Sequence, residues 1–262
     1  MKFFFEKIGN VTLQFFGEMG EIFFLILGIH RWMFKKPFEP NLIFQQMVKI
    51  GVDTLPVSLT TALFTGMVLA LQTGFTLETK LKGATQFLGA VVSLSMVREL
   101  GPVLTALIAA GRIGSSIAAE IGTMKVTEQL DALNTLAANP VKYLAVPRFL
   151  AFTFMLPFLT IFSDLTGWFG GLVVSVYRLK TPSVFYIDST LQDLKYTDIL
   201  GGLLKALVFG AAIAIVCCQK GFSTEGGAEG VGKSTTSAVV VSFMVVLIAD
   251  YFITAILTAF HL

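Results

Sequence analysis

Long apolar runs dominate the pattern of hydrophobic and polar positions along the chain. They lie near residues 52–75, 86–110, 146–177, 199–218 and 237–260. Each run reaches the roughly 20 residues that a helix needs to cross a bilayer. The third run is overlong and contains Pro157, so we expect it to be kinked or to begin in the membrane interface. The pattern predicts an all-α integral membrane protein with about five transmembrane helices.

The first 50 residues have a different pattern. Residues 1–28 alternate apolar and charged positions at helical spacing, and four internal charges make them a poor span. We expect a helix in the membrane interface, with an apolar face formed by Phe4, Ile8, Val11, Phe15 and Ile22. Pro37 and Pro40 interrupt the helical pattern after this segment, and residues 41–51 predict a second, short amphipathic piece. The sequence thus divides into interfacial and elbow helices over 1–50 and a transmembrane domain over 51–262.

Composition agrees with a membrane protein. Of all residues, 55% are hydrophobic and only 14% are charged, whereas soluble domains carry about 25% charged residues. The net charge of +2 is too small to indicate a nucleic-acid partner. Cys217 and Cys218 are adjacent in an apolar run, so we interpret them as small apolar residues rather than as a disulfide. The sequence has no cluster of His and Cys, so it predicts neither a metal site nor a bound cofactor.

The distribution of Lys and Arg predicts the orientation. With the N-terminus in the cytoplasm, the cytoplasmic segments are 1–51, 219–236, and 111–145 with the start of the third run. They hold twelve of the 19 Lys and Arg residues, against five in the external loops. Cytoplasmic loops of membrane proteins carry an excess of Lys and Arg. The rule therefore places the N-terminus in the cytoplasm and the C-terminus outside.

Residues 227–234, GAEGVGKS, match the phosphate-binding pattern G-x-x-x-x-G-K-S. A phosphate-binding loop needs a strand before it and a helix after it. This stretch lies between the fourth and fifth apolar runs, and the chain has no room for an ATPase domain of about 150 residues. We expect a Gly-rich loop capped by Ser234 or Thr235 before the last helix. The chain is therefore not expected to be an ATPase, and any energy from ATP must come from a separate subunit.

Five charged residues fall inside the apolar runs. Arg98 and Glu99 are in the second run, Asp164 in the third, Lys205 in the fourth and Asp250 in the fifth. A charge at membrane depth costs a few kcal/mol, so it indicates a functional site. Arg98 and Glu99 are consecutive and diverge by about 100° around a helix, so they cannot simply neutralise each other. Lys205 is a candidate partner for Glu99. The alternatives are structural ion pairs that fix helix register, or side chains that snorkel to the interface, as Lys205 could.

Small residues and an amphipathic helix fill residues 111–140. Pairs such as Gly114 and Ala118 have the four-residue spacing that lets helices approach closely. A short helix follows, over about 123–137, with Thr127 as its expected N-cap. Its apolar stripe faces away from Glu128 and Asp131. The pattern leaves open whether this helix packs on its own bundle or docks into a groove on another protein.

Three blocks resemble the MlaE-type permeases of lipid-transporting ABC systems that work with MCE-domain proteins. They read MVRELGPVLTALIAAGRIGSSIAAEIGTMKVTEQLDAL at 96–133, NPVKYLAVPRFLA at 139–151 and EGGAEGVGKSTTSAVVVSFMVVLIADYF at 225–252. With GMVLALQ at 66–72 they cover the chain from about residue 50 to its end. The resemblance also implies that Lys233 completes the phosphate-binding pattern by chance, since the family has a small residue or Arg there.

The resemblance implies a function, partners and a location. The chain would be the permease of an ABC transporter that moves phospholipid between the bacterial inner membrane and a periplasmic MCE-domain protein. It would form a homodimer with two copies of a cytoplasmic ABC ATPase and an MCE-domain hexamer. It would be a multi-pass protein with a periplasmic C-terminus and no ATPase site of its own.

The resemblance also implies site residues. The lipid-binding site would contain Arg98, Glu99 and Lys205, and the path of the acyl chains would be lined by Val68, Leu69, Leu71 and Met96. The helix that couples to the ATPase would present Met124, Glu128, Gln129, Asp131 and Leu133.

Two other functions compete with this one. A proton-coupled secondary transporter would use the carboxylates of Glu99, Asp164 and Asp250 as a relay, although the sequence shows no clear inverted repeat. A membrane scaffold would use the small-residue faces for assembly alone, and would leave Arg98 and Glu99 without a purpose.

Overall fold

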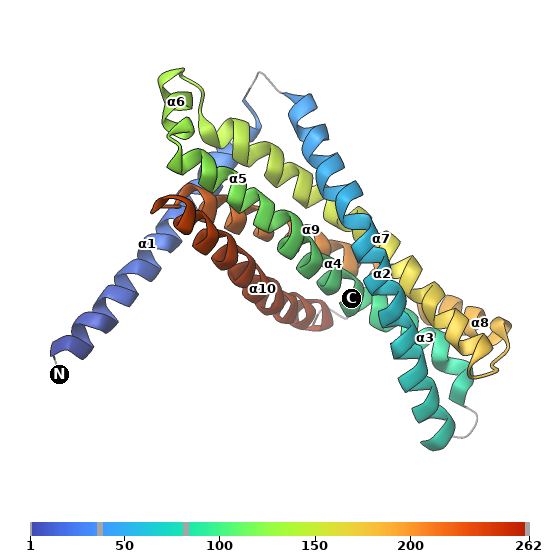
Figure 1. The fold of residues 1–262 in the computed structure, drawn as a ribbon. Coiled ribbons are helices and arrows are strands. Elements are labelled where there is room, and N and C mark those ends of the chain that lie inside the picture. The colour runs from blue at the N-terminus through green and yellow to red at the C-terminus, as the bar shows by residue number, and fades with distance from the viewer. Residues whose placement is uncertain (1, 36–38, 81–83, 260–262) are drawn as a thin grey trace.

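The structure is a computed structural model that describes residues 2–35, 39–80 and 84–259 (Figure 1). These residues are helical throughout, apart from short connections, and contain no strand. Within them, five helical segments are long and apolar enough to cross a membrane. The prediction of an all-α membrane protein with about five spans is confirmed.

The helices follow one another along the chain with short connections. The first span is α2 (Pro40–Lys80), and α1 (Lys2–Met33) precedes it. The second is one helical path of six pieces, and the third adds α7 (Val146–Tyr177) to the π-helical turn η4 (Val141–Ala145). The fourth and fifth are α9 (Tyr196–Phe222) and α10 (Gly227–Ala259). The six pieces of the second span are η1 (Ala84–Phe87), α3 (Leu88–Ser95), η2 (Met96–Leu100), α4 (Gly101–Ala109), η3 (Ala110–Gly114) and α5 (Ser115–Val126).

Two boundaries differ from the prediction in the first half of the chain. The expected short piece over residues 41–51 is the first part of α2, which continues through Pro56. The second span does not end near residue 110 but reaches Val126. Its small residues lie against α9, where a Cβ at Gly114 would meet Cys217 and one at Gly122 would meet Thr224. The hydropathy of this stretch is low because it is rich in small residues, which allow close helix packing, and not because it is a loop.

The expected helix over 123–137 is shorter in the structure. Thr127 is the C-cap of α5 rather than an N-cap. Glu128 then adopts a left-handed conformation, with φ of 60°, and α6 spans only Gln129–Thr135. A further helix between the third and fourth spans, α8 (Ser183–Asp193), was not predicted.

The Gly-rich stretch before the last span is helix, not loop. The expected cap residues Ser234 and Thr235 lie inside α10, and the Thr235 hydroxyl donates to the carbonyl of Val231 at 2.7 Å. Lys233 pairs with Glu229 one turn earlier at 2.7 Å. From Val231 onward the backbone N–H groups bond within the helix, so residues 227–234 do not form the strand-to-helix loop in which a G-x-x-x-x-G-K-S motif surrounds a phosphate.

Helix α1 points away from the bundle and is attached to it near its C-terminal half (Figure 1). Glu18 pairs with Lys220 at 2.8 Å, and Glu21 accepts a hydrogen bond from Gln219 at 2.9 Å. Of the predicted interfacial face, Ile22 is half-buried. The side chains of Phe4, Ile8, Val11 and Phe15 lie outside the described residues.

The closest helix crossing joins α2 and α7. A Cβ at Gly66 would overlap the backbone of Gly167, and a Cβ at Gly170 would overlap the carbonyl of Leu63. Beside this crossing, Tyr186 of α8 is buried and its hydroxyl donates to the carbonyl of Trp168 at 3.2 Å. Burial raises the pKa of the Tyr186 phenol, which keeps it a neutral donor. The C-terminal half of α7 is therefore fixed to α2 and to α8.

We expect Gly66→Val to destabilise the fold, because the new side chain must push α2 away from Gly167. Overpacking of this kind costs about 1–3 kcal/mol. Thermal unfolding in detergent measures the loss. Gly20→Val is the matched control, because no atom lies near a Cβ at Gly20. An equal loss in both variants would contradict the close approach at Gly66.

Candidate functional site

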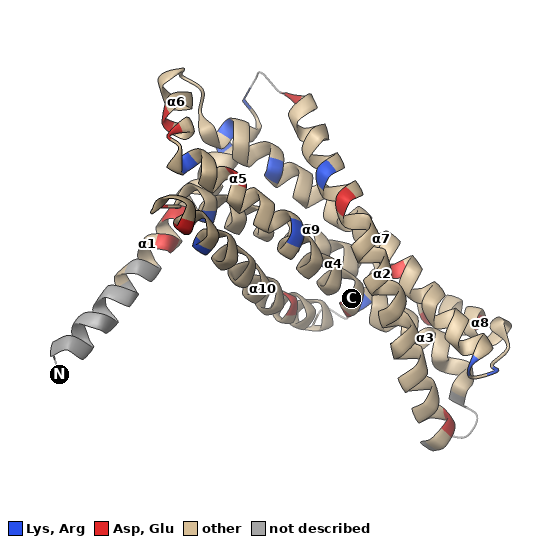
Figure 2. Ribbon diagram, in the orientation of Figure 1, with Lys and Arg blue, Asp and Glu red and all other residues tan. Residues whose placement is uncertain are grey.

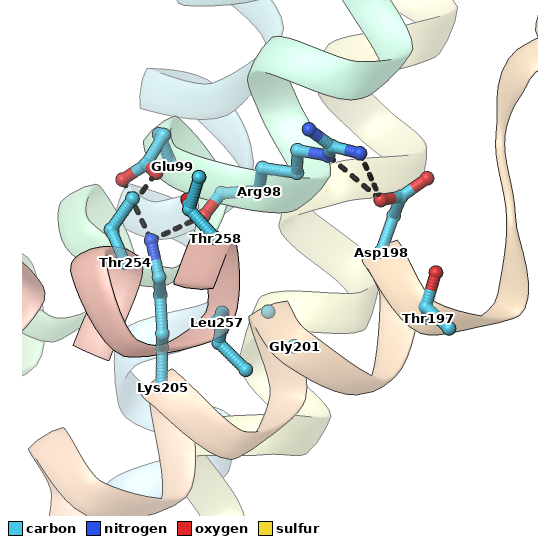
Figure 3. A pocket seen from close by; sticks show the side chains of 10 residues that line it. Arg98, Glu99, Thr197, Asp198, Gly201, Lys205, Thr254, Leu257 and Thr258 are labelled. Atoms are coloured by element: carbon cyan, nitrogen blue, oxygen red, sulfur yellow. Dashed lines mark hydrogen bonds and ion pairs between the residues drawn. The ribbon is translucent and has the colours of Figure 1, made fainter. Parts of the chain in front are cut away.

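Three of the five charged residues predicted inside the membrane, Arg98, Glu99 and Lys205, meet at a small pocket of about 70 Å³ (Figure 3). Its walls come from η2, the first turns of α9 and the end of α10. Arg98, Glu99, Asp198, Lys205 and Thr254 are among its lining residues. The structure therefore brings together three of the predicted lipid-site residues, Arg98, Glu99 and Lys205.

A proline explains why the helix widens at this place. Pro102 has no N–H group, so it cannot bond to the carbonyl of Arg98 four residues earlier, and its ring crowds that carbonyl. Residues Met96–Leu100 form a π-helical turn, in which the N–H of Gly101 bonds to the carbonyl of Met96. The turn leaves carbonyl groups without their usual helical partners. Such groups need another donor at membrane depth.

Lys205 supplies that donor. Its ammonium donates to the carbonyl of Arg98 at 2.8 Å and also pairs with Glu99 at 2.8 Å and with Asp250 at 3.0 Å. The Lys205 side chain is only 3% exposed. The predicted pair of Glu99 and Lys205 is thus present, and the alternative that Lys205 snorkels is wrong. Gly202 lets α9 come this close, because a Cβ there would overlap the carbonyl of Val97.

Arg98 has a separate partner, as the 100° divergence from Glu99 requires. Its Nε donates to Asp198 Oδ1 at 2.7 Å, and its Nη2 lies 2.5 Å from the same oxygen. The Asp198 side chain is 1% exposed and accepts a further bond from the N–H of Lys195 at the start of α9. The Arg98 side chain is 53% exposed, so part of its guanidinium remains open to a ligand. Asp198 was not predicted as a site residue, because it precedes the expected fourth run.

The other predicted site residues lie apart from this pocket. Met96 is buried against Gly167 and faces a second, apolar cavity. Val68 and Leu71 are exposed on α2, and Leu69 packs against the core cluster around Ala70. The structure does not bring these three α2 residues into the charged pocket. Among the described residues, no group of three or more His, Cys, Asp or Glu could hold a metal ion.

Comparison with known proteins gives this geometry a context. The family model described as "Permease MlaE" matches residues 43–256. The chain belongs to the MlaE permease family. It is 46% identical over 254 residues to a probable ABC transporter permease of Rickettsia typhi, covering 95% of this chain and 96% of the relative. It is 37% identical over 257 residues to the intermembrane phospholipid transport system permease MlaE of Haemophilus influenzae, covering 97% of each chain.

A plant relative is similar over a shorter region. The chloroplastic protein TRIGALACTOSYLDIACYLGLYCEROL 1 of Arabidopsis thaliana is 42% identical over 209 residues, which are 79% of this chain and 59% of the relative. The family and these relatives establish a membrane-embedded permease subunit of an ABC transporter. They favour that function over a proton-coupled carrier and over a scaffold.

In this permease, α6 projects from one end of the bundle (Figure 1). Of the residues predicted to couple to an ATPase, Glu128, Gln129 and Asp131 are exposed on this projection. Met124 and Leu133 instead pack against the main core cluster. Leu136, which was not predicted as a contact, is 77% exposed beside them. The projection thus combines exposed acidic and apolar side chains.

Glu120 of α5 joins three spans near the same end. It pairs with Lys49 of α2 and with Arg148 of α7, the latter at 2.9 Å, and it accepts a bond from Ser116 at 3.2 Å. The Arg148 side chain is only 7% exposed and also donates to the carbonyl of Leu144. Sequence patterns missed this group because Lys49 and Glu120 fell in segments assigned to the cytoplasm.

We expect Lys205→Met to lower the free energy of unfolding by about 3 kcal/mol, because it leaves Glu99, Asp250 and the Arg98 carbonyl without their cation. SDS titration in mixed micelles measures this. Lys233→Met removes an exposed cation and should change stability by at most about 0.5 kcal/mol.

Adding Glu99→Gln and Asp250→Asn to Lys205→Met should recover part of the loss, because no uncompensated carboxylate then remains. A triple variant less stable than Lys205→Met would contradict the role given to the ammonium.

Proposed function

We propose that this permease moves phospholipid between the bacterial inner membrane and a periplasmic MCE-domain protein, driven by a separate ABC ATPase. The observation that carries the proposal is a half-exposed arginine beside paired carboxylates at membrane depth. The ion pairs of Lys205 fix the spans, but they do not require the exposed part of the Arg98 guanidinium. The name of the Haemophilus influenzae relative, an intermembrane phospholipid transport permease, supports the same substrate.

The charged pocket suits the headgroup of a phospholipid. The open part of the Arg98 guanidinium presents N–H donors, and guanidinium matches the oxygens of a phosphate. Glu99 is 40% exposed and balances the charge of Lys205. Threonine hydroxyls at positions 197, 254 and 258 add polar groups to the wall. The acyl chains would follow the apolar side chains of Val68, Leu69, Leu71 and Met96.

Energy would enter through α6. In this proposal Glu128, Gln129 and Asp131 contact the ATPase, while Met124 and Leu133 anchor the helix to the bundle. Closure of two ATPase subunits on ATP would move α6, and α5 would transmit the movement to η2. Glu120, paired with α2 and α7, would spread it to three spans.

The proposed assembly contains two copies of this chain, two ATPase subunits and an MCE-domain hexamer. The N-terminus would be cytoplasmic and the C-terminus periplasmic. Figure 2 supports this orientation, because more of the blue ribbon segments, which mark Lys and Arg, lie toward the end of the bundle that carries α6. The exposed face of α10 has apolar residues available for a second copy, including Met244, Leu247, Ile248 and Tyr251.

We expect Arg98→Gln and Glu99→Gln each to reduce ATP-driven lipid transfer about tenfold, which is the value of one lost charge-assisted hydrogen bond. Transfer of fluorescent phospholipid from proteoliposomes to the MCE-domain protein measures it. Both variants should still assemble with the ATPase, and Lys233→Gln should transfer lipid at the wild-type rate. Normal transfer in both pocket variants would refute the headgroup site.

We expect Asp131→Arg and Leu136→Asp to weaken binding of the ATPase, because both side chains are exposed on the projection. Co-purification of the ATPase with the tagged permease measures the loss. Asp193→Arg makes the same charge change at the opposite end of the bundle and should retain the ATPase. If all three variants retained it equally, α6 would not be the docking element.

A further inference from the structure

A second cavity lies on the other side of η2 from the charged pocket. It has a volume of about 300 Å³ and is bounded by η2, α7, α8 and α9. Its walls are mainly apolar and include Met96, Ile161, Leu165, Trp168, Ile199 and Leu203. Size and lining match the cavities that bind small apolar ligands. Exposed side chains at its rim, Leu165 at 59% and Ile199 at 39%, open it toward the surroundings of the chain.

Three polar side chains also line the cavity, and two of them have partners. The Ser93 hydroxyl donates to the carbonyl of Ala90 at 3.1 Å. The Thr190 hydroxyl donates to the carbonyl of Tyr186 at 2.9 Å and accepts from the Trp168 indole at 3.0 Å. The third is Asp164, and its carboxyl has no hydrogen-bond or ion-pair partner among the described residues.

Asp164 is also separated from the ion pairs of the charged pocket. Arg98 uses Asp198, and Lys205 uses Glu99 and Asp250. The Asp164 Oδ1 atom is buried against the backbone at Gly101, where a Cβ would overlap it. A buried polar group without a partner is costly at membrane depth, and an apolar side chain would avoid that cost. The ion pairs of the charged pocket therefore do not explain why residue 164 is an aspartic acid.

We propose that this cavity, which we call the Asp164 cavity, binds an amphiphile that carries a hydrogen-bond donor. The apolar body of the ligand would fill the space between Met96, Leu165 and Leu203, and its hydroxyl or ammonium group would donate to Asp164. The ligand needs a donor because the carbonyl oxygen of a carboxyl accepts a hydrogen bond in either protonation state. Binding at this site needs neither the Arg98 pocket nor ATP, although Met96 also belongs to the proposed path of the acyl chains.

Trp168 lines the cavity and provides the readout. The full chain, carrying Trp32→Phe so that Trp168 is its single tryptophan, is placed in phosphatidylcholine nanodiscs. Quenching of Trp168 fluorescence is followed with 11-bromoundecanol, 11-bromoundecylamine and methyl 11-bromoundecanoate. The three probes have similar chains, but the ester has no hydrogen-bond donor. The alcohol and the amine distinguish a hydroxyl ligand from a cationic one.

We expect saturable quenching by the alcohol or the amine at about one tenth of the ester concentration, the value of one hydrogen bond to a buried carboxyl. Asp164→Leu should abolish this preference, and it should fold normally because it removes an unpaired polar group. Should Asp164→Leu fail to fold, Asp164→Asn keeps the shape and should lose the preference for the amine. Asp193→Asn, the same change on the exposed end of α8, should behave as the wild type.

Equal quenching by all three probes would mean partition into the bilayer only and would overturn the proposal. A donor preference that persists in both Asp164 variants would overturn it as well. Because no ATP or partner protein is present, either result is distinguishable from a failure of the lipid-transfer proposal.

Discussion

Pro102 determines how the charged residues of the second, fourth and fifth spans are arranged. It removes the helical donor for the Arg98 carbonyl, which then needs another partner. The Lys205 ammonium fills that place and holds two carboxylates from neighbouring helices. One cation thus sets the register of the second, fourth and fifth spans. The widened turn also directs Arg98 and Glu99 to different partners, so each of these two charges is balanced without the other.

The turn η2 divides two cavities of opposite character. Its residues Arg98 and Glu99 face the charged pocket, whereas Met96 and Val97 face the Asp164 cavity. A regular helix places consecutive residues 100° apart, so one turn reaches two faces. The same five residues therefore contribute to a site for polar groups and to a site for apolar ones.

The sequence predicted the spans and the Glu99–Lys205 pair, because long apolar runs and isolated charges are strong signals. It failed where small residues lower hydropathy. The stretch from Gly227 to Thr236 resembles a loop by composition, yet it is helix, and it is helix without close packing, because no atom lies near a Cβ at Gly227 or Gly232. Asp198 and Glu120 were missed for a related reason. Asp198 lies one residue before the expected fourth run and Glu120 ten residues after the expected second, and only three-dimensional packing shows that Asp198 meets Arg98 and that Glu120 meets Arg148.

The unbroken helical path from Ala84 to Val126 has a mechanical consequence. The part from Arg98 to Val126 is roughly 40 Å long, at 1.5 Å per residue. A straight helix transmits a displacement along its axis, but it does not convert that displacement into rotation. Each of the wide turns η2 and η3 contains one residue more than an α-helical turn, and a shift of that extra residue along the path would move the adjoining helix by about 1.5 Å and rotate it by about 100°. A displacement applied at α6 would then reach Arg98 as a rotation of the helix.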